Sequence, residues 1–316
     1  MGKQTGNQKI VLRFLKTIYF LLTITFFSDG VAQNQFQDFL TPSDTLNIPR
    51  RNTVAIAETV ALGGALVGLN QLWYKDYEKS NFHFKNDNAH WLQMDKAGHA
   101  FSAYHMGRFG AELLEWSGAS RNSQLIYGST LGFTFLTAVE IMDGYSAEWG
   151  FSWGDVAANA SGTALYVGQE LLWKEQRIVP KFSFHRTPYA GVRPEVLGNG
   201  LSEEILKDYN GQTYWLSANI HSFFKESKIP KWLNLAVGYG GEGMITANDA
   251  LVNTIFLPEK ERTRQFYVSF DVDLTKIKTQ NHFLKTLFSV FNTIKVPAPT
   301  LEFRELGGVK GRILYF

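Results

Sequence analysis

The first residues that could carry out chemistry form a short polar run, Asp95-Lys96-Ala97-Gly98-His99. If this run is helical, Asp95 and His99 lie one turn apart on the same face, with Lys96 three residues before His99. A carboxylate, an amine and an imidazole in one place are suited to acid–base chemistry, and carboxylates also bind hard metal ions. Asp95 has a simpler alternative role, because an acidic residue at the start of a helix often caps it.

Two further polar groups follow in apolar surroundings. Glu140 and Asp143 lie three residues apart at the end of a strongly apolar stretch. Asp155, Asn159 and Gly162 have the i, i+4, i+7 spacing of a single helix face. The loop between the two groups adds three more polar residues, namely Ser146, Glu148 and Ser152.

Each group alone is weak evidence, but a polar side chain buried in an apolar helical region needs a partner. We therefore expect the groups to converge in one network, with six candidate members: Asp95, Lys96, His99, Glu140, Asp155 and Asn159. Three alternatives stay open at this point: a functional pocket, a purely structural network, or residues scattered over the surface. The sequence identifies no cofactor and does not decide whether a metal ion is bound.

Four helical stretches of about 20 residues must position these groups. They are expected at Thr53–Tyr74, Ala97–Trp116, Leu125–Met142 and Gly154–Trp173, and none contains an internal proline. Each contains two small residues four apart, a spacing that lets helix backbones approach closely, as in membrane bundles. The pairs are Gly64 with Gly68, Gly107 with Ala111, Gly128 with Gly132, and Ala158 with Gly162.

Six of the eight tryptophans lie at or near the ends of these stretches, as expected for side chains at a membrane interface. They are Trp73, Trp91, Trp116, Trp149, Trp153 and Trp173. We therefore expect the helices to be embedded in a membrane or tightly associated with one. The second stretch carries several charged residues, so it could only be central, with its polar groups turned inward. The alternative is a water-soluble periplasmic bundle with a glycine-rich core.

After Pro180 the pattern becomes strand-like. Phe266, Val268, Phe270 and two later apolar residues alternate with polar ones over Gln265–Leu274, a period of two that indicates a strand. Five other short runs read similarly and are separated by turn residues: Lys181–His185, Thr213–His221, Leu233–Tyr239, Thr300–Arg304 and Arg312–Phe316.

The beginning of the chain predicts export. Four basic residues precede an apolar run of 11 residues, and small residues follow up to Ala32, which is the pattern of a cleavable secretory signal. Removing residues 1–32 leaves a net charge near −1, so no basic excess points to a nucleic-acid partner. The sequence contains no cysteine, which argues against disulfides, thiolate metal sites and a lipid-modified N-terminal cysteine.

The order Asp95-Lys96-x-x-His99, then Glu140, then Asp155-x-x-x-Asn159-x-x-Gly162 resembles the VanZ-like membrane proteins. It resembles even more the YfiM-type family of predicted periplasmic lipoproteins of unknown function. The resemblance covers about residues 90–173. It implies an envelope location and a shared helical core, but no activity. The chain departs from that family in lacking the cysteine for lipid attachment and in carrying a long C-terminal half.

The sequence thus predicts an α+β protein in which a four-helix, membrane-associated core precedes a β-rich C-terminal region. The expected segments are a signal peptide (1–32), a linker (33–50), the helical core (51–177) and the β-rich region (178–316). We expect a cell-envelope protein, in the periplasm or outer membrane, that serves a structural or interaction role with membrane lipid or envelope proteins as partners. The alternative is an enzyme that acts on a lipid or an envelope glycan through an Asp/His/Glu pocket.

Overall fold

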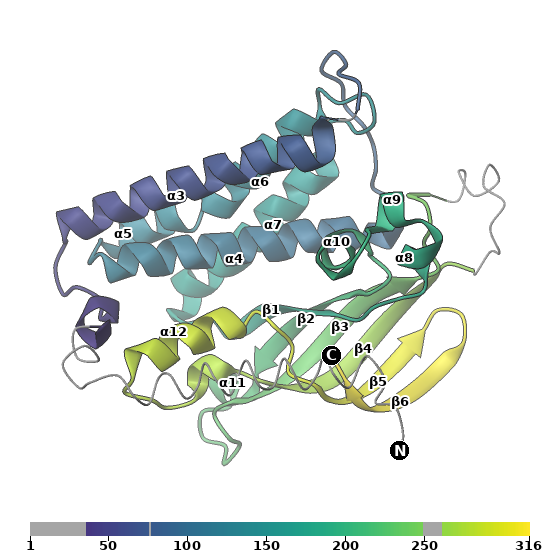
Figure 1. Ribbon diagram of the computed structural model, residues 1–316. Helices are drawn as coiled ribbons and strands as arrows, with labels where there is room; N and C mark the ends of the chain where they lie inside the picture. Colours follow the sequence, from purple (N-terminus) through teal and green to yellow (C-terminus); the bar gives the residue numbers. More distant parts are fainter. Residues whose placement is uncertain (1–35, 76, 249–260) are drawn as a thin grey trace, which may run out of the picture.

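The computed structural model describes residues 36–75, 77–248 and 261–316, and the predicted signal peptide lies outside them. The helices of the N-terminal half form one layer, and a sheet from the C-terminal part forms a second layer beneath it (Figure 1). The helical layer contains α3 (Ile48–Leu69), α4 (Met94–Trp116), α5 (Arg121–Ser123), α6 (Leu131–Asp143) and α7 (Trp153–Trp173).

The predicted helices lie close to these bounds, and their starts have local causes. Asn47 caps α3 by accepting a hydrogen bond from the Arg50 amide at 3.0 Å, and Pro49 fits its first turn. The helix then continues as a π-helical turn, Asn70–Tyr74. Ser152 caps α7 in the same way, with its hydroxyl 3.1 Å from the Asp155 amide.

One helix differs from its expected form. The stretch predicted to run unbroken over Leu125–Met142 begins as a π-helical turn, Gln124–Gly128, and α6 starts only at Leu131. At this break a Cβ on Gly128 would lie 2.6 Å from the backbone of Ala111 on α4. The close approach of the two backbones accompanies the irregular turn, a detail that helical periodicity does not reveal.

Small residues do form helix contacts at three of the four predicted pairs. A Cβ on Gly107 would lie 2.3 Å from the Ser129 carbonyl oxygen, one on Gly132 would lie 2.4 Å from that of Ala103, and one on Gly162 would lie 2.0 Å from that of Ala100. The fourth pair differs, because a Cβ on Gly64 or Gly68 would meet no described atom within 4 Å. The two glycines of α3 therefore make no close helix contact within the described part of the chain.

The C-terminal part forms a six-stranded antiparallel sheet in the order β1 to β6. Each of its strands overlaps one of the six predicted strand-like runs. The strands are β1 (Ile178–Phe184), β2 (Gln212–Asn219), β3 (Leu233–Glu242), β4 (Thr263–Val272), β5 (Ala298–Arg304) and β6 (Gly308–Tyr315). Short helices lie between and beside them: α8 (Tyr189–Val192), α9 (Pro194–Leu197), α10 (Leu201–Lys207), α11 (Ile220–Phe223) and α12 (His282–Phe291).

The sheet is strongly curled. The Tyr315 hydroxyl on β6 lies 3.3 Å from the Thr213 hydroxyl on β2 and 3.0 Å from the Tyr267 hydroxyl on β4, although β6 pairs only with β5. The opposite edge is covered by the segment before β5, since Phe182 of β1 exchanges backbone hydrogen bonds with Thr293 and Lys295. The curl encloses one face of the sheet. The other face packs against α4 at β1 and β2 and is exposed on β3 to β5.

The two faces have unexpected polarities. On β4 the enclosed side chains are Thr263, Gln265, Tyr267, Ser269 and Asp271, and the exposed ones are Phe266, Val268 and Phe270. The enclosed side also holds the fully buried Lys181, whose ammonium lies 2.8 Å from the Asp271 carboxylate. The apolar stripe seen in the sequence therefore faces outward. Alternation identifies two faces, but it does not say which of them is inside.

Candidate functional site

The first polar run opens α4 and brings a lysine among three carboxylates. Lys96 Nζ lies 2.7 Å from Asp87 Oδ1, 3.0 Å from Asp95 Oδ2 and 3.0 Å from Asp155 Oδ1. Asp95 is not the N-cap, a position that Gln93 occupies without a side-chain bond. Its carboxylate instead accepts a hydrogen bond from the Lys96 amide at 2.9 Å. Lys96 thus joins the loop before α4 to the start of α7.

His99 joins the other candidate residues. Its Nδ1 lies 2.9 Å from Asn159 Oδ1, and its Nε2 lies 3.6 Å from Glu140 Oε1 and 3.8 Å from Asp155 Oδ1. Glu140 is held from its other oxygen, which accepts a hydrogen bond from the Ser152 amide at 3.2 Å. The six predicted residues therefore lie in one continuous network across α4, α6 and α7.

The other polar residues singled out in the sequence differ in their relation to this network. Asp143 accepts a hydrogen bond from the Tyr74 hydroxyl at 2.6 Å. The Ser146 hydroxyl accepts a hydrogen bond from the Glu148 amide at 3.3 Å. The Ser152 hydroxyl donates a hydrogen bond to the Asp87 carboxylate at 2.6 Å. Gly162 provides the close approach of α7 to α4 described above.

Burial and charge act against each other on the three carboxylates around Lys96. Burial raises the pKa of Asp95, although Lys96 opposes the shift. Burial likewise raises the pKa of Asp155, against the influence of His99 and Lys96. Burial would also raise the pKa of Asp87, but hydrogen bonds from Lys96 and Ser152 outweigh it and lower that pKa. One ammonium group therefore compensates the three carboxylates unequally.

The ammonium group itself is held in its charged form. Burial would lower the pKa of Lys96, but the carboxylates of Asp95, Asp87 and Asp155 outweigh this and raise it above its usual value. Lys96 is thus a permanent cation of the network and a poor general base.

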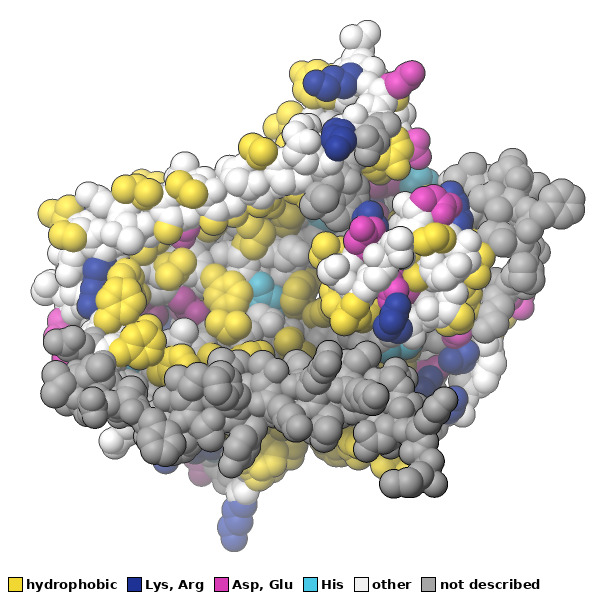
Figure 2. All heavy atoms as spheres, in the orientation of Figure 1, with side chains coloured by type: hydrophobic (Ala, Val, Ile, Leu, Met, Phe, Trp, Pro, Cys, Tyr) yellow, Lys and Arg dark blue, Asp and Glu magenta, His cyan; other side chains and the backbone are white. Residues whose placement is uncertain are grey.

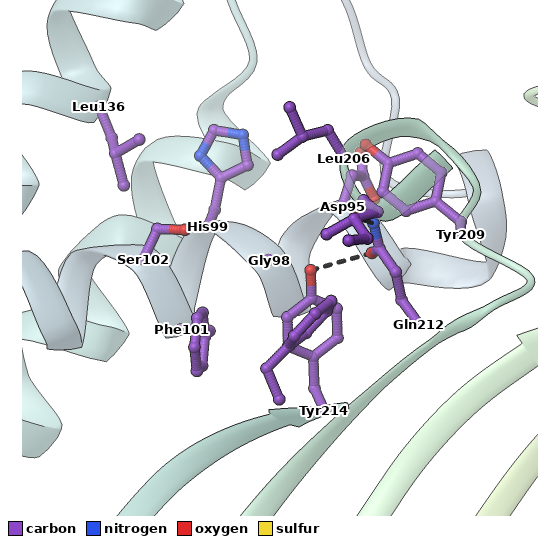
Figure 3. A pocket seen from close by; sticks show the side chains of 12 residues that line it. Asp95, Gly98, His99, Phe101, Ser102, Leu136, Leu206, Tyr209, Gln212 and Tyr214 are labelled. Atoms are coloured by element: carbon purple, nitrogen blue, oxygen red, sulfur yellow. Dashed lines mark hydrogen bonds between the residues drawn. The ribbon is translucent and has the colours of Figure 1, made fainter. Parts of the chain in front are cut away.

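A cavity of about 320 Å³ adjoins the network. It lies between α4, α10 and the β1–β2 end of the sheet, and His99 projects from α4 beside it (Figure 3). One part of its wall is apolar, with Phe101, Leu136, Phe182, Ile205 and Leu206, and another part is polar, with Asp95, His99, Ser102 and Gln212. The side chains of Tyr209 and Tyr214 complete the wall.

Sequence reasoning missed two parts of this site. Asp87 lies in a loop of ordinary polar composition, and no spacing relates it to Lys96. Tyr209, Gln212 and Tyr214 come from the C-terminal part and reach the cavity only because β2 packs against α4. No local signal in the sequence announces either contribution.

Comparison with known proteins agrees with this division of the chain. Residues 83–169 match a protein family described as "Predicted periplasmic lipoprotein (DUF2279)". The matched segment contains the whole network and ends before β1. It supports the expected location in the cell envelope and the periplasm, and it assigns no activity. No curated protein and no solved structure matches the chain.

Proposed function

We propose that this is a membrane-associated envelope protein with a structural or interaction role, whose sheet and first long helix face lipid. The observation that carries the proposal is the reversed polarity of the sheet. Exposed Leu235, Val237, Phe270, Leu301 and Phe303 share the outer face with Phe266 and Val268. Apolar surface left in water costs roughly 25 cal/mol per Å², so a large exposed face of this kind favours contact with lipid or another apolar surface.

The helical layer supports the same proposal. Two helical segments, Ile48–Leu69 and Arg121–Asp143, are long and apolar enough to cross a membrane by length and composition alone. Within α3 only Val54 is buried, and Ile56, Val60 and Val67 are each more than 60 % exposed. Figure 2 shows hydrophobic side chains at the surface along the upper left of the view, where Figure 1 places α3. A water-soluble helix normally buries such a stripe against its neighbours.

Carbonate washing of isolated envelopes tests the proposal. We expect the wild-type protein to stay in the membrane pellet. Phe270→Asp places a charge on the outer face and is expected to shift protein into the wash, because a charged side chain at the centre of a bilayer costs about 2.5–3.5 kcal/mol even on the mildest scale. Lys228→Asp introduces the same residue in an exposed loop and serves as the control. Release of the wild-type protein with the soluble fraction would contradict membrane association.

A second candidate function, an enzyme acting on a lipid or an envelope glycan, has one specific observation in its favour. The polar network adjoins a cavity whose wall is partly apolar and partly polar, the usual composition of a small-molecule site. However, both ring nitrogens of His99 already face protein groups, namely Asn159 on one side and two carboxylates on the other. Direct proton transfer from this imidazole to a bound molecule would require the ring to leave those partners.

Complementation of a deletion strain tests this candidate. If His99 is catalytic, the His99→Gln variant should fail to complement the deletion strain. The variant protein should still accumulate and unfold cooperatively on heating. Full complementation by this variant would exclude a catalytic role for His99.

A further inference from the structure

Three potential ligand atoms from three different helices face one point beside the cavity. One ligand atom each from His99 on α4, Glu140 on α6 and Asp155 on α7 lie within 4.8 Å of one another. The imidazole nitrogen is 3.6 Å from the Glu140 oxygen and 3.8 Å from the Asp155 oxygen. Ligand atoms that share one ion at about 2.0–2.2 Å lie roughly 3–4 Å apart, so a small inward shift would allow all three to bind one ion.

The imidazole is oriented for this role. Its Nδ1 lies 2.9 Å from Asn159 Oδ1, and Asn159 is completely buried. An amide oxygen accepts a hydrogen bond, so this contact places the proton on Nδ1 and leaves the lone pair of Nε2 directed at the two carboxylates. Histidines that bind metals are commonly held in this way, with the second ring nitrogen donating to a carbonyl or carboxylate oxygen.

A carboxylate oxygen at this point is not fully satisfied. Asp155 is 95 % buried, and its Oδ1 accepts no hydrogen bond. The Lys96 ammonium lies 3.0 Å from it but directs its hydrogen bond to Oδ2, at 3.1 Å. A buried carboxylate oxygen without a hydrogen bond is costly unless another positive group faces it.

The charges of the network leave room for such a group. Asp87, Asp95 and Asp155 surround Lys96, so the ammonium already occupies the point where those three carboxylates meet. Glu140, 2 % exposed, lies on the other side of Asp155, and its carboxylate faces His99 instead of Lys96. Among the described residues, the ion pairs of these four carboxylates involve one permanent cation, Lys96. Glu140 therefore has no permanent cation as an ion-pair partner among the described residues.

From this geometry we propose that His99, Glu140 and Asp155 bind one divalent metal ion, with Asn159 holding the imidazole in position. One imidazole and two carboxylates form a mixed ligand set that suits ions such as Zn²⁺ and Mn²⁺. Three protein ligands leave a coordination position open for water or another molecule. His99, the imidazole ligand, also lines the adjoining cavity. The proposal does not depend on membrane association.

Zn²⁺ titration of the full-length protein, purified in detergent and stripped with a chelator, tests the proposal by calorimetry. We expect one equivalent to bind. Asn159→Ala should weaken binding by about 10–100-fold, as for the loss of a group that orients a ligand. Glu140→Gln removes a ligand charge at nearly constant volume and should weaken binding more. Glu112→Gln, a partly exposed carboxylate on α4, is the matched control and should bind as the wild type does.

Co²⁺ provides a second measurement, because its visible absorption reports an ordered ligand set. We expect a saturable band in the wild-type protein and in Glu112→Gln, and its loss in Glu140→Gln while the circular dichroism stays unchanged. Failure of the wild-type protein to take up one equivalent of either ion would overturn the proposal without any variant. Equal affinities in the wild type and in folded Glu140→Gln would overturn it as well.

Discussion

His99 on α4 and Asn159 on α7 face each other with 2.9 Å between Nδ1 and Oδ1. The contact is possible because the two helix backbones come very close one turn further along α7, where Gly162 packs against the Ala100 carbonyl. The close packing of small residues and the polar contacts therefore occur on the same face of α7. This buried face carries Asp155, Asn159, Gly162, Tyr166 and Gln169 in helical succession.

Gly162→Ala should therefore separate α4 from α7. The added Cβ would lie 2.0 Å from the Ala100 carbonyl oxygen, so the backbones must move. We expect the free energy of unfolding to fall by about 1–3 kcal/mol, as for overpacking in a core. Gly168→Ala on the same helix is the control, because a Cβ added there would meet no described neighbouring atom within 4 Å. Alanine at this position should stabilise the helix by about 0.5–1 kcal/mol. Urea unfolding in detergent compares the two, and equal effects would contradict the packing argument.

Lys96→Met should destabilise the fold strongly. It removes the ammonium that three carboxylates share and leaves those carboxylates without a cation. Breaking a buried ion pair from one side typically costs about 3–5 kcal/mol. Lys228→Met in an exposed loop should change the unfolding free energy by less than about 0.5 kcal/mol. A Lys96→Met protein as stable as the wild type would mean that the network contributes little to the fold.

Asp271→Asn tests the polar interior of the curled sheet. The Asp271 carboxylate lies 2.8 Å from Lys181 Nζ and 3.9 Å from Lys295 Nζ, and all three side chains are fully buried. Without the negative charge two buried ammonium groups remain, so we expect a loss of about 3–5 kcal/mol in thermal or urea unfolding. Glu305→Gln, which removes a surface partner of Arg264, should cost less than about 1 kcal/mol. A loss no larger than that of this control would show that the interior admits water.

His105 should make the fold sensitive to acid. Its Nε2 donates to the Pro180 carbonyl at 2.7 Å and its Nδ1 accepts from Arg108, an arrangement that requires the neutral ring. Burial, with Arg108 and Lys181 nearby, lowers the pKa of His105 from 6.5 to about 3. Above pH 6.5 the ring is neutral in both folded and unfolded chains. Between pH 6.5 and 3 only the unfolded chain takes up the proton. The free energy of unfolding therefore decreases as the pH is lowered, by up to about 1.4 kcal/mol per pH unit.

His105→Gln isolates this contribution. The glutamine amide can still donate to a carbonyl but takes up no proton, so the fall in melting temperature between pH 6.5 and 4 should be shallower than in the wild type. His282→Gln, at the start of α12, is the control and should follow the wild-type curve. Parallel pH curves for the wild type and His105→Gln would show that acid acts elsewhere.

The sequence predicted where the helices and strands lie better than it predicted what packs around them. Helical periodicity placed α4 and α7 within a few residues, and strand-like runs located all six strands. The spacing of Asp95, His99, Asp155 and Asn159 was informative because residues four apart share a helix face, whatever packs against it. Convergence with Glu140 followed from the cost of burying polar groups without partners.

What the sequence did not reveal depends on long-range packing. The alternation of Phe266 and Tyr267 was evident, but only the curl of the sheet decides that Tyr267 is inside. Asp87 joins Lys96 from a loop, and Tyr214 reaches the cavity from a strand more than 100 residues away from His99. Neither relationship leaves a local pattern that periodicity can detect.

The most direct test of the central claim measures whether the outer face of the sheet lies in lipid. Because the chain contains no cysteine, Val268→Cys gives a single site for a nitroxide spin label on that face, and Lys228→Cys gives one in an exposed loop. Both proteins are reconstituted into liposomes, and the collision rates of each label with oxygen and with a water-soluble nickel chelate are compared. We predict that the label at 268 is accessible to oxygen and shielded from nickel, while the label at 228 is accessible to nickel. Equal nickel accessibility at the two sites would contradict the claim that this face contacts the membrane.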